Sequence, residues 1–81
     1  MINLQETLAD IAKAIVDTPE EVKVEMTEDE NNIMLTLVVA SDEKGMVIGR
    51  HGKIAKAIRT VIKAAAANSG KKVTVDIVDF R

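Results

Sequence analysis

The chain has 81 residues with no cysteine, one histidine and one aromatic residue, Phe80, which is enough sequence for a single small domain over residues 1–81. The absence of cysteine excludes disulfides and thiolate zinc sites, and a lone histidine excludes a multi-histidine site, so we expect no metal and no cofactor. The net charge of −2 conceals an asymmetry of −9 over residues 1–43 and +8 over residues 44–72, which favours an anionic partner for the second segment unless the charges only balance on the surface.

The first half of the chain predicts a helix followed by a β-hairpin. Asn3 is suited to cap a helix whose apolar residues recur at helical spacing over residues 4–15. Residues 22–26 alternate apolar with polar side chains, which is typical of a half-buried strand, and residues 28–32 are a polar turn. Residues 33–40 are apolar on nearly both faces. They predict a central strand that pairs antiparallel with the first strand and has helices on one side.

The second half predicts two helices and a last strand. Ser41 is placed to cap a short helix over residues 42–48, and a longer amphipathic helix covers residues 54–65. Residues 73–78 alternate as a strand, and the crossover through the helices makes this strand parallel to the central one. The predicted fold class is α+β, in the order α-β-β-α-α-β, with a three-stranded mixed sheet covered by three helices on one face.

A glycine-hinged basic segment, GRHG at residues 49–52, separates the two helices of the second half. It is not a P-loop, because Val47 replaces the first glycine and Ile54 replaces the final Ser or Thr. Val47 also breaks the dinucleotide-binding pattern. Two glycines permit a sharp turn, and the following helix N-terminus, with Lys53 and Lys56 close by, favours phosphate. The sequence therefore predicts a clamp for a sugar-phosphate chain, the alternative being a turn whose glycines serve geometry only.

The element order and V-I-G-x-x-G between paired helices resemble a type II KH domain. The stretch GMVIGRHGKIAKAIRTVIKAAAA is similar to the small single-domain bacterial KH proteins of the KhpA type. The resemblance implies a single-stranded RNA-binding protein, which acts as a post-transcriptional regulator or RNA chaperone and clamps about four nucleotides at its loop. It implies that Ile48 floors a groove for the bases while the loop and the next cations meet phosphates. The implied nucleic-acid-binding residues are Ile48, Gly49, Arg50, His51, Gly52, Lys53 and Lys56.

The resemblance also implies partners, namely a second copy of the chain or a larger bacterial KH-containing protein. Two alternatives stay open: a KH-fold protein-interaction module with little RNA affinity, and a single-stranded DNA binder. The sequence also leaves open whether Arg59 and Lys63 contact nucleic acid. Catalysis is not expected, because no Ser or Cys nucleophile accompanies His51 and the acids are interpreted as solvated charge.

The N-terminal residues MINLQE have neither a basic start nor a long apolar run, so we predict no signal peptide. The longest apolar stretch, residues 33–40, is too short to span a bilayer. We therefore expect a cytoplasmic protein with no membrane partner.

Overall fold

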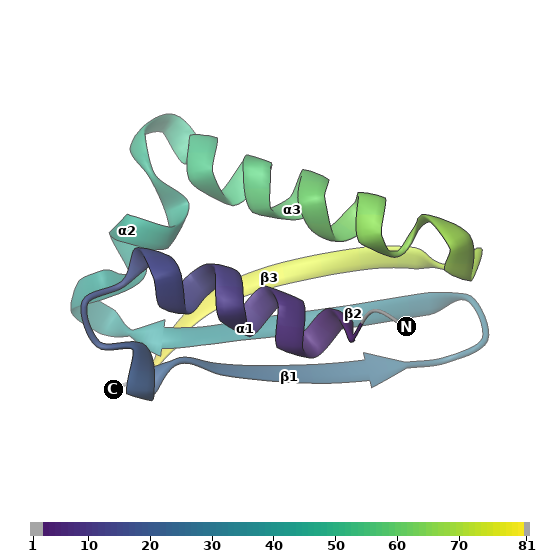
Figure 1. Cartoon of the computed structure of the whole chain (residues 1–81), viewed down its shortest axis with the longest axis horizontal. Helices are drawn as coiled ribbons and strands as arrows, with labels where there is room; N and C mark the ends of the chain where they lie inside the picture. The colour runs from purple at the N-terminus through teal and green to yellow at the C-terminus, as the bar shows by residue number, and fades with distance from the viewer. Residues whose placement is uncertain (1–2, 81) are drawn as a thin grey trace.

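The computed structural model describes residues 3–80 (Figure 1). The predicted order α-β-β-α-α-β is confirmed, and four short 3₁₀ turns lie between these elements. The three strands form one sheet in the order β1-β2-β3. The helices and strands are α1 (Leu4–Ile15), β1 (Lys23–Glu28), β2 (Asn32–Ala40), α2 (Lys44–Ile48), α3 (Lys53–Ala65) and β3 (Lys72–Phe80).

The sheet is mixed, as the crossover argument predicts. β1 pairs antiparallel with β2, with Glu28 opposite Ile33 at the turn end. β2 pairs parallel with β3, with Asn32 opposite Lys72 at the start of both strands. Both β2 and β3 therefore end at the side of the molecule where the chain enters α2 (Figure 1). This topology places the loop between α2 and α3 at one end of the molecule and the β1–β2 turn at the other.

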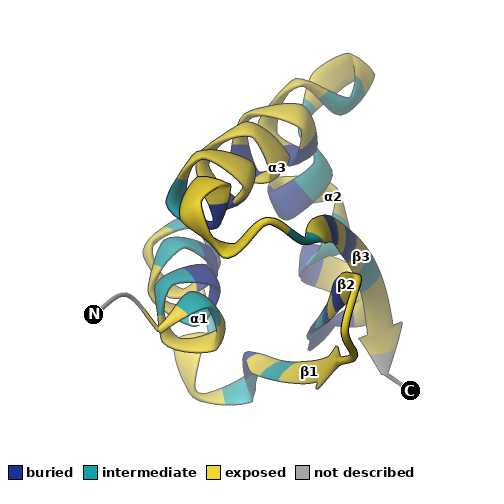
Figure 2. Cartoon of the chain, turned by 90° about the vertical axis from the view of Figure 1, so that its right-hand side faces the viewer, coloured by how far each residue is buried: buried dark blue, intermediate teal, exposed yellow. Residues whose placement is uncertain are grey.

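The helices cover one face of the sheet, and the core lies between the two layers (Figure 2). Side chains alternate across β2, so its odd-numbered residues face the helices and are buried. Three of its even-numbered residues, Met34, Thr36 and Val38, form what we call the open face, whereas Ala40 at the end of the strand is buried. Met34 on this face is 44% exposed, whereas Leu37 on the opposite face is fully buried. The predicted one-sided helix cover is therefore confirmed.

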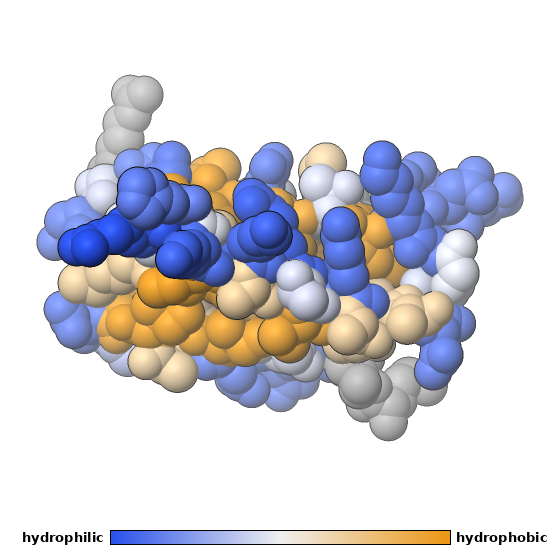
Figure 3. All heavy atoms as spheres, turned by 90° about the horizontal axis from the view of Figure 1, so that it is seen from above, coloured by the Kyte–Doolittle hydropathy of each residue, from blue (hydrophilic) through white to orange (hydrophobic). Residues whose placement is uncertain are grey.

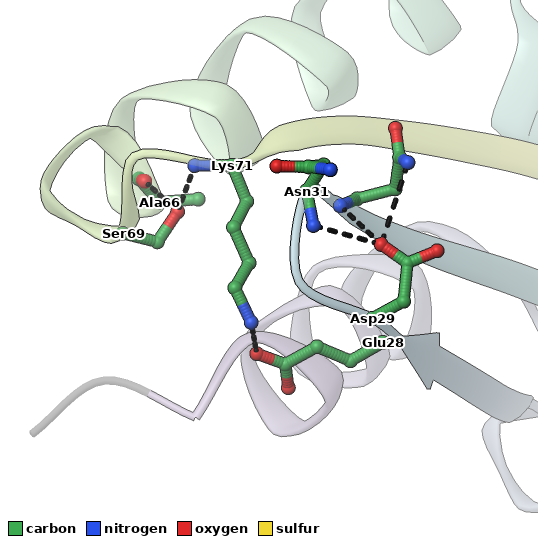
Figure 4. A network of polar contacts seen from close by, with 7 residues as sticks. Glu28, Asp29, Asn31, Ala66, Ser69 and Lys71 are labelled. Atoms are coloured by element: carbon green, nitrogen blue, oxygen red, sulfur yellow. Dashed lines mark hydrogen bonds and ion pairs between the residues drawn. The ribbon is translucent and has the colours of Figure 1, made fainter.

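The turn between β1 and β2 is held by one carboxylate (Figure 4). Oδ1 of Asp29 accepts hydrogen bonds from the backbone N–H groups of Asn31 and Asn32, each at 2.8 Å. These two bonds lower the pKa of the Asp29 carboxyl from its ordinary value, because they stabilise its charged form. A second contact in the same region, the ion pair between Lys71 and Glu28, joins the hairpin to the start of β3.

We expect Asp29→Ala to lower the melting temperature at neutral pH, because it removes both turn hydrogen bonds. The folded-state pKa lies below the unfolded one, so the contribution of the carboxylate is complete above about pH 4 and is lost as pH falls through the folded value. Melting curves should therefore show the difference between wild type and Asp29→Ala shrinking below about pH 4. Asp29→Asn keeps the acceptor oxygen without titrating, so its advantage over Asp29→Ala should not change with pH. If the difference in melting temperature between wild type and Asp29→Ala also stayed constant with pH, the turn hydrogen bonds would not depend on the charge of Asp29, and the lowered pKa would be contradicted.

The predicted helix over residues 42–48 is wrong at its start. Residues Ser41–Glu43 form a 3₁₀ turn, α2 begins only at Lys44, and Ser41 provides no side-chain cap. The backbone of Glu43, at φ −109° and ψ −3°, departs from regular α-helix and separates the two segments. Its side chain turns inward, and Glu43 is buried. The interpretation of the acids as uniformly solvated is therefore also wrong at this residue.

Smaller differences concern the first strand and the helix ends. β1 begins one residue later than predicted, because Val22 ends the preceding 3₁₀ turn, and it continues to Glu28. Of the residues predicted to face inward, Val22 is buried and Val24 is half-buried, while Met26 is 39% exposed. Asn3 does cap α1, since its side chain accepts a hydrogen bond from the Glu6 N–H at 3.0 Å. None of the helices within residues 3–80 has the length and apolar character needed to cross a membrane.

Candidate nucleic-acid interface

The loop between α2 and α3 is built on three residues with positive φ. Gly49 has φ 76° and ψ 172°, a conformation that is essentially restricted to glycine. His51 has φ 58° and ψ 24°, and Gly52 has φ 74° and ψ 14°. Both lie in the left-handed region, which histidine tolerates better than most side chains. The predicted role of the two glycines in reversing the chain is therefore seen in the backbone itself.

Gly49 is further constrained by a close neighbour. A Cβ atom at this position would lie 2.6 Å from Cγ1 of Ile54, which is too close for any side chain. At Gly52 no atom lies within 4 Å of the corresponding point. The two glycines therefore have different requirements: Gly49 needs both its backbone angles and the empty space, and Gly52 needs only the angles.

Hydrogen bonds within the loop use the first N–H of α3, since the Lys53 N–H donates to the Arg50 carbonyl, but no side chain of the described residues caps this helix end. The Gly49 N–H donates to the Gly45 carbonyl at 2.8 Å, and the Gly52 N–H donates to the Gly49 carbonyl at 3.1 Å. Among residues 3–80 no side chain caps the N-terminus of α3, because its N-cap residue is Gly52. The first N–H groups of a helix, with the positive end of its dipole, bind anions when no side chain occupies them.

The structure brings the predicted site residues together at this end of the molecule. Arg50 and His51 are exposed at the loop, and Lys53 and Lys56 are exposed on the first turn of α3. Ile48 is the last residue of α2 and is half-buried. The described residues contain no cluster of three His, Asp or Glu side chains able to hold a metal ion. The chemistry available here is therefore positive charge and backbone N–H donors beside an apolar surface.

A second basic region lies between α3 and the edge strand β3. Arg59 donates from Nε to the Val75 carbonyl at 3.1 Å, which attaches α3 to this edge. Two adjoining hollows lie beside this contact, and both are lined by Lys63, Lys72 and Val73. From the sequence alone, it stays open whether Arg59 and Lys63 contact nucleic acid. Lys72 is not among the predicted site residues, because the strand that contributes it lies far along the chain. Only the absence of acids over residues 44–72 indicated these residues.

The surface seen from above the helices combines charge with an apolar band (Figure 3). Hydrophilic side chains form a row over the helices, and the apolar band runs beside it (Figure 3). Two residues of α3, Ile54 and Val61, are exposed and lie seven positions apart, so they share one side of the helix. Met46 on α2 is also exposed. Apolar surface is therefore accessible close to the basic loop.

Comparison with known proteins identifies relatives over nearly the whole chain. A family model described as KhpA/KhpB, KH domain, matches residues 5–77. A protein named RNA-binding protein KhpA from Clostridium acetobutylicum is 51% identical over 75 residues, which cover 93% of this chain and all of that protein. A protein of the same name from Clostridium perfringens is 49% identical over the same shares of both chains.

Among solved structures, Era in complex with MgGDPNP and nucleotides 1506–1542 of 16S ribosomal RNA has the same fold over 94% of this chain. The TM-score is 0.69 at 17% sequence identity, and the match covers 29% of the Era chain. This likeness supports the fold, which is consistent with a type II KH domain, and the relatives at higher identity support the family. The chain belongs to the KhpA/KhpB family of KH-domain proteins.

Proposed function

We propose that this protein binds single-stranded RNA, with the sugar-phosphate backbone held at residues 49–52 and the bases over the apolar surface beside Ile48. The observation that carries this proposal is a glycine-built loop that exposes Arg50 and His51 next to an uncapped helix N-terminus. Phosphate is one of the anions that helix N-termini bind in proteins. The two clostridial relatives are named RNA-binding proteins, which supports RNA as the nucleic acid.

The mechanism divides the strand between two regions. Phosphates bind to Arg50 at the N-terminus of α3, which no side chain within residues 3–80 caps, while Lys53 and Lys56 add charge within the same turn. The strand then follows α3 toward Arg59 and the hollows lined by Lys63 and Lys72. α3 has 13 residues, a length of about 20 Å, which suits a few extended nucleotides. The acidic first half repels the strand from other surfaces, which leaves one productive face.

The test is a titration of a short fluorescent single-stranded RNA pool with wild type and with the double variant Arg50→Asp, His51→Asp. Aspartate is tolerated at positive φ, so the variant should fold, which circular dichroism checks. We expect its affinity to fall at least about tenfold, since one charge-assisted hydrogen bond is worth about 1.5–3 kcal/mol. For wild type, three neutralised phosphates predict a salt slope of about −2 on a log–log plot.

Two controls separate the alternatives. Equal binding by both proteins would assign the affinity to the α3–β3 region and contradict the loop mechanism. A single-stranded DNA pool of matched sequence tests the DNA alternative, because the 2′-hydroxyl is the group that distinguishes the two polymers. If neither protein binds either polymer, the domain is a protein-interaction module instead.

Pairing with a second copy, or with a larger KH-containing protein, is part of the same proposal. The exposed residues Ile54 and Val61 provide apolar surface for such a contact. One domain that holds about four nucleotides binds weakly, and pairing raises the effective concentration of the second site. A paired protein would be suited to post-transcriptional regulation or RNA chaperone activity in the cytoplasm.

A further inference from the structure

Glu43 is a buried acid that the loop mechanism does not use. It is 4% exposed and is the only buried charged residue within residues 3–80. Its Oε2 accepts hydrogen bonds from the Asp17 N–H at 3.1 Å and from the Thr18 hydroxyl at 2.9 Å. Its Oε1 accepts from the Thr18 N–H at 3.3 Å. The carboxylate therefore ties the segment after α1 to the N-cap position of α2.

Burial of this carboxylate calls for a specific reason. Lys and Arg side chains usually accompany a buried acid, yet no ion pair among the described residues includes Glu43. Three neutral donors satisfy the charge instead, so the bonds depend on the exact direction of each donor. The contact is therefore a directional link between two segments 25 residues apart in the chain.

The position of Glu43 connects this link to the RNA site. α2 has only five residues and is followed directly by Gly49, the first residue of the loop. Val47, four residues after Glu43, is fully buried, and residues four apart lie on the same side of a helix. Glu43 and Val47 are thus two inward anchors, one at each end of α2. Together they set the rotation of α2 about its axis, and with it the direction in which Ile48 and Gly49 leave the helix.

We propose that Glu43 is a positioning residue for RNA binding, which holds α2 and the loop in the conformation that meets phosphate. This inference rests on the proposed function, because one of its two measurements is the affinity for RNA. Removal of the carboxylate would let α2 rotate and lower the population of the competent loop. The apparent Kd rises in inverse proportion to that population, so a population of about one tenth raises it about tenfold.

The test compares Glu43→Gln with wild type in two measurements. Glutamine keeps the length of the side chain but presents an NH₂ donor toward the Asp17 and Thr18 donors. We expect the RNA Kd of the folded protein to rise about tenfold. In ¹H–¹⁵N spectra without RNA, the Gly49 and Gly52 amide signals should shift or broaden. Thr18→Val, which removes only the hydroxyl donor, should change both readouts in the same direction by less, and it serves as the test if Glu43→Gln does not fold.

A stability control separates positioning from general destabilisation. Ile33→Val deletes one buried methylene in β2, beside the hairpin turn and away from α2. It should lower the melting temperature while leaving the loop amides and the RNA Kd of the folded fraction unchanged. If Glu43→Gln behaves like Ile33→Val, the positioning role is overturned. If wild type binds no RNA, the proposed function fails, and the loop amide signals alone then decide whether Glu43 positions the loop.

Discussion

Gly49→Ala should destabilise the protein by about 2–6 kcal/mol and abolish measurable RNA binding at concentrations that saturate wild type. The backbone at this residue, φ 76° and ψ 172°, is a region that only glycine occupies readily. Forcing alanine into it costs about 1–3 kcal/mol. The new methyl group would also lie 2.6 Å from Ile54 Cγ1, and overpacking of this kind adds about 1–3 kcal/mol. Urea unfolding followed by circular dichroism measures the loss.

Gly52→Ala is the matched control in the same loop. Its φ of 74° is also unfavourable for alanine, yet nothing lies within 4 Å of the added methyl group. The expected cost is therefore the backbone term alone, about 1–2 kcal/mol, and Gly52→Asn should cost less, because asparagine tolerates the left-handed region. Equal losses for Gly49→Ala and Gly52→Ala would show that the contact with Ile54 relaxes freely.

Periodicity alone predicted most of the fold correctly. The odd-numbered residues of β2 and the inward residues of α3, such as Ile58 and Ile62, are buried as their spacing predicts. The residues that a strand or helix buries recur along its own sequence with a period of 2 or 3.6, so the sequence of that segment alone is enough to predict which face is buried. The glycines at 49 and 52 were identified by the same kind of local signal, because a positive φ has few sequence solutions.

Two features that the sequence does not reveal, the burial of Glu43 and the place of Lys72, depend on contacts between distant segments. Glu43 carries no local signal of burial, since it follows Ser41 and Asp42 in what resembles an ordinary acidic first turn. Its burial depends on three donors supplied by Asp17 and Thr18. In the same way, Lys72 joins Arg59 and Lys63 only because β3 returns alongside α3. A single sequence contains the donors and the acceptors but not their pairing.

Leu37→Ala should cost about 2–5 kcal/mol, the usual range for deleting a fully buried leucine side chain. An 81-residue domain has a total stability of about 4–12 kcal/mol, so this variant should lose a large fraction of the total. Met34→Ala removes a side chain of similar size from the same strand and introduces the same residue. Because Met34 is 44% exposed on the open face, its loss should cost less than about 1 kcal/mol.

The comparison of these two variants also tests whether the open face is solvated in solution. Urea unfolding at two protein concentrations, at least about tenfold apart, measures both losses. A small cost for Met34→Ala that is independent of concentration supports a sheet with helices on one side and solvent on the other. A cost near that of Leu37→Ala, growing with protein concentration, would mean that another chain covers Met34, since stability gained from association depends on concentration. The open face, and not only the exposed side of α3, would then be the surface through which this protein pairs.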